Sequence, residues 1–196
     1  MDLAVRTATE VDKIVERELT QCWLRPGEVL RLGCPPLYGH VGLRLGAELH
    51  VPYTAARETP KVSGAPPRWP VPGAVPEEDW TDDPALGYWA VARERGQLAV
   101  LLADHFAAGA GEARLTWTNQ RLAVVYPAKL LAEGGASGPF TTGEEFDTRA
   151  VTGLDALHPG RSFPPRPVLR FGFADGSAVF LRDVLAPLKV ARARQR

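Results

Sequence analysis

The residues that could do chemistry in this chain are its histidines, its cysteines and its clustered carboxylates. The histidines are His40, His50, His105 and His158, and the cysteines are Cys22 and Cys34. No histidine stands three or four positions from another histidine or from a cysteine, so the sequence lacks the ligand spacing of a zinc site. We therefore predict no metal ion and no other cofactor. A site that folding assembles from distant positions remains the alternative.

Serine nucleophiles and phosphate-binding loops also lack their usual sequence context. The serines considered are Ser63, Ser137, Ser162 and Ser177, and none stands in a Gly-x-Ser-x-Gly turn. The glycine-rich run 134–138 has no lysine after it, which indicates a plain loop. We predict that the protein is not an enzyme. The alternative is a site built from His105, His158 and the acidic loops, if folding places two of them within hydrogen-bond reach in a cleft.

The clustered carboxylates fall in two parts of the chain. One group is Glu77, Glu78, Asp79, Asp82 and Asp83, and the other is Glu144, Glu145 and Asp147. Their spacing does not follow the alternate positions of an EF-hand calcium loop. Because charged residues lie mostly at protein surfaces, we interpret both groups as exposed acidic loops.

Composition and charge narrow the class of protein. The chain has 196 residues, of which 45% are apolar and 23% charged, and its 23 basic residues balance 23 acidic ones. This favours a folded, soluble protein and makes nucleic-acid binding an unlikely function. Two cysteines, no secretory signal and no apolar run of about 20 residues favour a reduced, cytoplasmic setting. We interpret the basic terminus after Val184, which includes Lys189 and Arg192, as a solvated, fraying end.

The elements that must position these groups begin with a helix over residues 7–25. The run Thr7 to Glu10 is a capping box, and Val11, Ile14, Val15, Leu19, Cys22 and Trp23 follow at helical spacing. Pro26 and Gly27 should end this helix. Strands are expected from Glu28 to about Leu32 and from Val41 to Leu45.

Residues 59–84 read as a proline-rich insertion. They contain seven prolines, a density that blocks both helix and sheet interior. We expect Trp69 and Trp80 to pack this loop onto the domain, and we name both as speculative binding residues. For this segment, a functional binding loop and a surface loop without a binding role are about equally supported.

The segment 86–106 contains two apolar runs separated at Gly96, and periodicity does not distinguish helix from buried strand in runs this short. Because Arg93 to Gly96 would serve as a hairpin turn, we favour two strands.

Two hairpins follow. Residues 113–126 alternate apolar and polar side chains around Asn119 and Gln120, which predicts a half-buried hairpin. Residues 168–181 turn at Asp175 and Gly176. If those two are the central residues, Phe171 faces Phe180 across the strands.

Three segments, Leu24–Leu30, Gly111–Val125 and Phe171–Leu181, carry a family resemblance. The first contains Pro-Gly-Glu, the second a threonine, a turn and Arg-Leu, and the third the later hairpin. In this order they resemble bacterial PH-like and GRAM-like domains over about half the chain. The resemblance implies a β-rich α+β fold: one domain over 1–196 with a PH-like, partly open barrel, an N-terminal helix and a short C-terminal helix after Val184. Another all-β sandwich is the alternative. Arg121 is interpreted as an anchor of the hairpin turn.

PH-like folds bind ligands through loops or a sheet edge, so the resemblance implies a binding or scaffold protein. We expect a protein partner at a strand edge or at the loop 59–84. The alternative is peripheral binding to anionic lipid, for which Lys129, Arg161 and Arg166, with Arg170, would lie near one rim. The sequence does not predict the oligomeric state.

Overall fold

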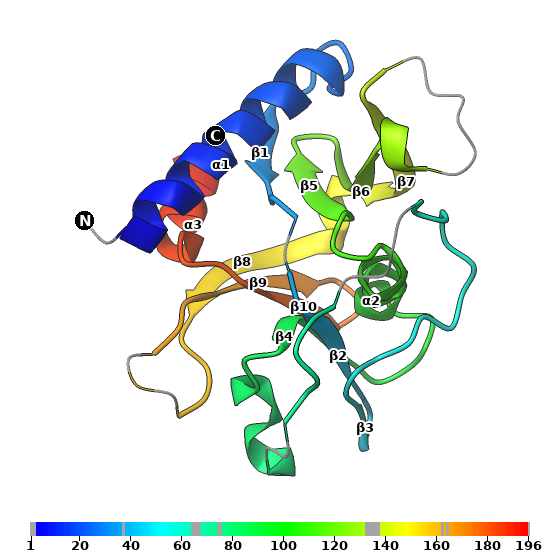
Figure 1. Ribbon diagram of the computed structural model, residues 1–196. Coiled ribbons are helices and arrows are strands. Elements are labelled where there is room, and N and C mark those ends of the chain that lie inside the picture. The colour runs from blue at the N-terminus through cyan, green and yellow to red at the C-terminus, as the bar shows by residue number, and fades with distance from the viewer. Residues whose placement is uncertain are drawn as a thin grey trace.

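The computed structural model describes residues 3–36, 38–63, 68–73, 76–131, 138–161, 163 and 165–195. In this part of the chain, two β-sheets and three α-helices form a mixed α+β fold (Figure 1). The β-rich α+β class predicted from the sequence is confirmed, and the all-β sandwich is not observed. The glycine-rich run 134–138 lies outside the described residues except for Gly138.

The four-stranded sheet is antiparallel, with its strands in the order β1-β5-β6-β7. Its strands are β1 (Leu30–Gly33), β5 (Arg114–Thr118), β6 (Arg121–Pro127) and β7 (Phe140–Asp147). The predicted hairpin at Asn119 and Gln120 is confirmed as β5 and β6. It is not half-buried, however, because every residue of β6 is buried.

The six-stranded sheet has the order β3-β2-β4-β10-β9-β8. Its strands are β2 (His40–Leu45), β3 (Glu48–His50), β4 (Leu86–Ala92), β8 (Val151–Leu157), β9 (Val168–Phe173) and β10 (Ala178–Arg182). Only the β2–β4 pair is parallel among these neighbours, and the segment between these strands includes the proline-rich insertion. The 3-10 helix η3 (Thr148–Ala150) leads from β7 into β8, so the edge strands of the two sheets are consecutive. The two sheets do not close into a barrel.

The main core lies between the sheets and the helix α2 (Leu98–Ala108), which packs on β2, β4 and β10. The prediction of two strands in 86–106 is therefore half wrong, since β4 is followed by a helix. The cause lies elsewhere in the sequence. Asp175 accepts a hydrogen bond from the Leu98 N–H at 2.7 Å, and Ser177 accepts one from the Ala99 N–H at 3.1 Å. The β9–β10 turn thus satisfies the free N–H groups that begin α2.

The helix α1 (Leu3–Cys22) covers the outer face of the four-stranded sheet, where Val15 and Leu19 pack on Ala123 and Val125 (Figure 1). This helix begins earlier and ends sooner than predicted, and its predicted buried stripe is partly wrong. Its buried residues are Asp12, Val15 and Leu19, whereas Val11 and Ile14 are 41% and 45% exposed.

The reason for this rotation is the C-terminal helix α3 (Ala186–Gln195). Lys189 is 1% exposed, and its Nζ lies 2.6 Å from both Asp12 Oδ1 and Asp183 Oδ2. Arg192 adds a 2.9 Å bond to the same Asp12. Burial alone would lower the pKa of Lys189. The neighbouring Cys34, Asp183 and Asp12 outweigh that effect and hold the pKa above its ordinary value. The interpretation of this terminus as a solvated, fraying end is therefore wrong.

The β9–β10 hairpin is confirmed, but its predicted register is wrong by one residue. Phe171 lies opposite Val179, and Phe180 lies opposite Arg170. The turn has three residues, because the Phe173 N–H bonds to the Ser177 carbonyl around Gly176, whose φ is +81°. Since a shift of one residue exchanges the faces of a strand, Phe180 stacks on Trp89 outside the main core.

Candidate functional site

Residues from two of the three segments that carry the family resemblance, Leu24–Leu30 and Gly111–Val125, meet at one end of the four-stranded sheet. The guanidinium of Arg121 donates to both oxygens of Glu28, at 2.8 and 3.0 Å, and to Glu145 at 2.6 Å. Thr118 donates to Glu28 at 3.1 Å, and Arg121 also stacks on the ring of Trp23 at 4.1 Å. We call these residues the Arg121 corner.

The central ion pair of the Arg121 corner, Arg121 with Glu28, is buried. Arg121 and Glu28 are 5% and 8% exposed. Burial alone would raise the pKa of Glu28, but the Arg121 guanidinium and the Arg25 N–H hold it below its ordinary value. Each of the three guanidinium nitrogens donates to a carboxylate, so the corner anchors the hairpin. This geometry supports the interpretation of Arg121 as an anchor.

The histidines do not gather into a metal site. No group of three or more His, Cys, Asp or Glu that could hold an ion is found in the part of the chain that the structure describes. His40 lies edge-on to Trp69, and His50 lies 3.5 Å from Glu48. His158 is exposed.

His105 does meet one of the predicted acidic groups. Its Nε2 lies 2.9 Å from Glu144 Oε2, and its Nδ1 lies 2.8 Å from the hydroxyl of Tyr126. Arg57 of the segment after β3 bonds to Glu144 at 2.6 Å, and it lies 3.4 Å from Asp104. Folding therefore brings together the kind of pair that would support an enzyme.

The His105 network is closed to a substrate, however. His105 is 3% exposed, Tyr126 is fully buried, and both ring nitrogens already have partners. Burial lowers the pKa of His105, and the opposing effect of Glu144 does not restore it, so the ring is neutral near pH 7. A neutral ring donates from Nε2 to Glu144 and accepts the Tyr126 proton at Nδ1, which leaves no nitrogen for catalysis. The network joins α2, β6, β7 and the segment after β3.

The two tryptophans of the insertion pack onto the domain, as expected. Trp80, in the 3-10 helix η1 (Glu77–Asp82), is 8% exposed and lies edge-on to Trp89. Trp69 is half-buried against His40. Trp80 therefore offers a partner little surface, while Trp69 offers more.

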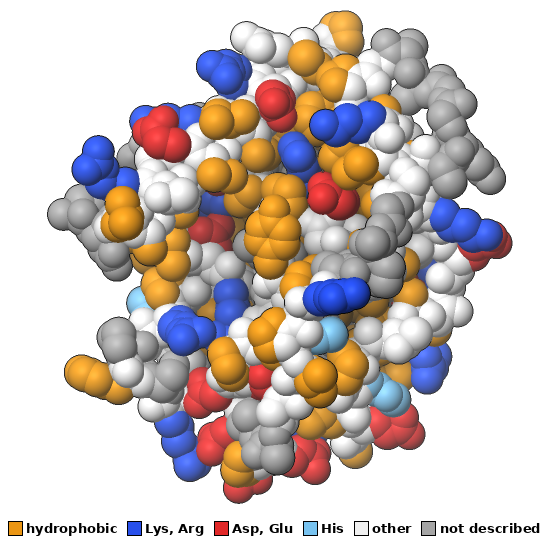
Figure 2. Space-filling view, in the orientation of Figure 1, with side chains coloured by type: hydrophobic (Ala, Val, Ile, Leu, Met, Phe, Trp, Pro, Cys, Tyr) orange, Lys and Arg blue, Asp and Glu red, His pale blue; other side chains and the backbone are white. Residues whose placement is uncertain are grey.

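The basic residues expected on one rim lie apart. Arg161 and Arg166 are exposed in the β8–β9 loop, at the lower left of Figure 1, and Arg170 pairs with Asp155. Lys129 lies in the 3-10 helix η2 (Ala128–Leu130), on the opposite side of the molecule. Carboxylates gather at the lower edge of Figure 2, where Figure 1 places η1. Asp79, a residue of η1, lies 3.3 Å from Arg161.

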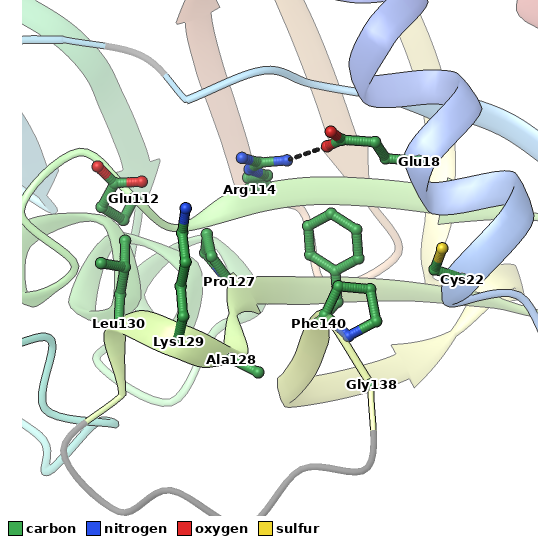
Figure 3. Close-up of a pocket in the computed structure, with 11 residues that line it drawn as sticks. Glu18, Cys22, Glu112, Arg114, Pro127, Ala128, Lys129, Leu130, Gly138 and Phe140 are labelled. Carbon is green, nitrogen blue, oxygen red and sulfur yellow. Dashed lines mark ion pairs between the residues drawn. The ribbon is translucent and has the colours of Figure 1, made fainter.

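Lys129 instead belongs to a groove of about 850 Å³ between α1 and the ends of β5, β6 and β7. The charged, thiol and aromatic residues that line this groove are Glu18, Cys22, Glu112, Arg114, Lys129 and Phe140. Figure 3 shows the amino end of Lys129 pointing toward the strand that carries Arg114, with Phe140 at the floor between η2 and α1. We call this the α1–β7 groove, and its volume suits a small ligand or a few residues of a peptide.

The cations of the α1–β7 groove are poorly matched. Arg114 is 13% exposed in its side chain, and its contact with a carboxylate, Glu18, is long at 3.7 Å. Its Nε and Nη1 are buried without a hydrogen-bond partner, while its Cζ lies 5.2 Å from the centre of the Phe140 ring. Among the described residues, Lys129 has no ion pair. Burying two guanidinium nitrogens without hydrogen bonds is costly, so this arrangement favours a bound anionic group.

Comparisons with protein-family models, with curated proteins and with solved structures find no match to this chain. The groove is therefore interpreted from its own geometry.

Sequence reasoning named Lys129 but missed its neighbours. Arg114, Glu18 and Phe140 come from three elements that only the fold brings together. One signal was present, since Arg114 alternates with Leu115 and Trp117 and so points away from the main core. That face of β5 was expected to be exposed to solvent, but α1 covers it.

Proposed function

We propose that this chain is a non-enzymatic binding protein that holds a segment of a partner protein in the α1–β7 groove and along the edge of β7. The observation that carries the proposal is the pairing of that groove with an open strand edge. β7 is the last strand of its sheet and pairs with β6 alone among the described strands. Its first residue, Phe140, lines the groove.

The edge of β7 suits the addition of a partner strand. None of the eight β7 residues is fully buried, whereas all seven residues of neighbouring β6 are. An extended peptide that pairs with such an edge gains main-chain hydrogen bonds, and a side-chain pocket beside the edge gives specificity.

A PH-like architecture belongs to the same proposal. It is supported by the Arg121 corner, where the Pro-Gly-Glu segment and the Thr-turn-Arg hairpin bond to each other. It is further supported by the direct step from β7 into β8 and by α3 near the C-terminus. We also propose a cytoplasmic location, which is supported by the two free thiols, Cys22 and Cys34, since thiols stay reduced in that compartment.

Site-specific photo-crosslinking in the native host tests this proposal. A photoreactive amino acid at Lys129, which is exposed at the groove, should give a discrete crosslinked species. The same amino acid at Glu94, exposed in the turn between β4 and α2, serves as the matched control. Equal crosslinking at both positions, or none at Lys129, would contradict a partner site in the groove.

Peripheral binding to anionic lipid remains a second candidate, favoured by one observation. Phe163 is 96% exposed in the β8–β9 loop, between exposed Arg161 and Arg166. An aromatic side chain flanked by arginines suits a membrane interface. The carboxylates of η1 beside Arg161 weaken that attraction. None of the described helices is long and apolar enough to cross a membrane.

Vesicle flotation at low salt separates this candidate from the first. Binding to anionic vesicles that Phe163→Ser abolishes, and that Val71→Ser leaves unchanged, would support it. Val71 is a suitable control because it is 86% exposed outside this loop. Equal recovery with neutral and anionic vesicles would exclude it.

A further inference from the structure

Arg114 is the starting point, because its side chain is only 13% exposed and yet two of its guanidinium nitrogens have no hydrogen-bond partner. The Glu18 oxygen at 3.7 Å lies beyond hydrogen-bond distance, and two of the three guanidinium nitrogens have no acceptor. An arginine fork binds a carboxylate best through two parallel bonds of about 2.8 Å. Glu18 does not reach that geometry from its position on α1.

Lys129 adds a second cation to the same groove. It is exposed, and Figure 3 shows its amino end directed toward the side of the groove where Arg114 lies. Phe140, the first residue of β7, supplies an apolar surface in the same groove, and its ring centre lies 5.2 Å from the Cζ of Arg114. The groove therefore presents two positive groups beside an apolar surface, at the start of an open strand edge.

The formal charges that line the groove cancel, so the ligand class rests on the hydrogen bonds that Arg114 lacks. Glu18 and Glu112 balance Arg114 and Lys129, so the groove is neutral before anything binds. The occupant proposed for the edge of β7 is a peptide, and among its side chains only aspartate and glutamate are anionic near pH 7. The acidic group nearest Arg114, Glu18, is itself a carboxylate.

We propose that the α1–β7 groove recognises an acidic side chain of an extended partner peptide, whose carboxylate replaces Glu18 as the partner of Arg114 and whose neighbouring apolar group packs on Phe140. The inference rests on the proposed function, since it names the chemistry of the segment that would pair with β7. Glu18 then acts as a weak internal competitor of the ligand.

If Glu18 competes with the ligand for Arg114, removing the charge of Glu18 should raise the affinity of the groove for the peptide. The probe is an acetylated and amidated peptide of alternating valine and threonine with one central glutamate, titrated into the full chain. Arg114→Gln and Lys129→Gln should each weaken binding, Arg114→Gln by roughly tenfold or more, because a hydrogen-bonded charge is lost. Glu18→Gln should tighten binding severalfold. Glu10→Gln is the matched control on α1, since Glu10 is 69% exposed and lies outside the groove.

Lys129→Gln and Glu18→Gln change partly or fully exposed side chains, so both variants should fold even if Arg114→Gln does not. The same peptide with a central glutamine should bind at least tenfold more weakly than the glutamate peptide. Equal binding of the two peptides, or weaker binding after Glu18→Gln, would overturn the inference. Displacement of the peptide by an equal concentration of inorganic phosphate would overturn the preference for a carboxylate.

The two proposals fail in different ways. If the peptides do not bind but the crosslink at Lys129 forms, the inferred ligand chemistry is wrong and the proposed function stands. If the crosslink also fails, the partner site itself is wrong.

Discussion

Two arginines on adjacent strands of the four-stranded sheet have opposite surroundings. Arg121, at the start of β6, bonds to Glu28 and Glu145 and stacks on Trp23. Arg114, at the start of β5, stacks on Phe140 but has no hydrogen bond at Nε or Nη1. Both stack on an aromatic ring. The difference lies in the carboxylates, and it separates a charge that holds the fold from one that is available to a ligand.

The largest effect is expected at the Arg121 corner. Arg121→Met removes the partner of Glu28, a carboxylate that is 8% exposed, and a broken buried ion pair costs about 3–5 kcal/mol of unfolding free energy. Urea unfolding followed by tryptophan fluorescence measures this loss. A cost below about 1 kcal/mol would show that the corner is not the anchor described above.

Lys189 should behave like Arg121, since its charge is buried and matched. Lys189→Met leaves Asp12 and Asp183 without the amine that lies 2.6 Å from each, although Arg192 still bonds to Asp12. We expect a loss of about 2–4 kcal/mol in thermal or urea unfolding. The exposed neighbour Leu188→Met, on the same helix, is the control and should change stability by less than about 0.5 kcal/mol.

The Arg121 corner should also make stability depend on acid pH. The pKa of Glu28 lies below its ordinary value of 4.5, because Arg121 and the Arg25 N–H outweigh the raising effect of burial. A carboxylate with a depressed folded pKa stabilises the fold above the unfolded pKa, and this contribution is lost as the pH falls through the folded pKa.

Unfolding free energies between pH 7 and pH 3 test this point. Arg114 has no close carboxylate partner, so Arg114→Met should keep the acid loss of the wild type. Glu145→Gln should reduce that loss by about 0.5 kcal/mol, since Glu145 has a lowered pKa but a side chain that is 42% exposed. An acid loss that disappears in Arg114→Met would contradict the contrast between the two arginines.

The smallest effect on stability is expected at the groove itself. Arg114→Met keeps an apolar stem on Phe140 and removes an arginine with two buried, unbonded nitrogens. We expect a change within about 1 kcal/mol in either direction, with stabilisation the favoured sign. A loss as large as that of Arg121→Met would mean that Arg114 is also part of the structural framework.

The sequence predicted most of the strands and the helix α1 because these elements carry local signals, whereas the C-terminal helix was expected only from the family resemblance. The alternation around Asn119 and the Asp175-Gly176 turn gave both hairpins. The helix α2 was missed because its N-terminal N–H groups bond to Asp175 and Ser177, far away in the sequence. The residues around the start of α2 therefore give no sign of the cap, because the β9–β10 hairpin supplies it.

The candidate site was predictable only in part, for a related reason. Lys129 was named from its charge alone, whereas the state of Arg114 depends on which carboxylates the fold brings near it. Arg114 and Arg121 stand in the same predicted hairpin, and the family resemblance marked Arg121 as an anchor without separating the environments of the two arginines. The placement of Glu28 beside Arg121, and of Glu18 at 3.7 Å from Arg114, makes that separation.

The most direct test follows the Nε–H signals of the two arginines by NMR while the glutamate peptide is titrated into the full chain. The account predicts that the Arg114 signal shifts until it saturates, with the same dissociation constant as the backbone signals of β7, while the Arg121 signal stays in place. A titration in which the Arg114 signal does not move, or in which both arginine signals move together, would contradict the account.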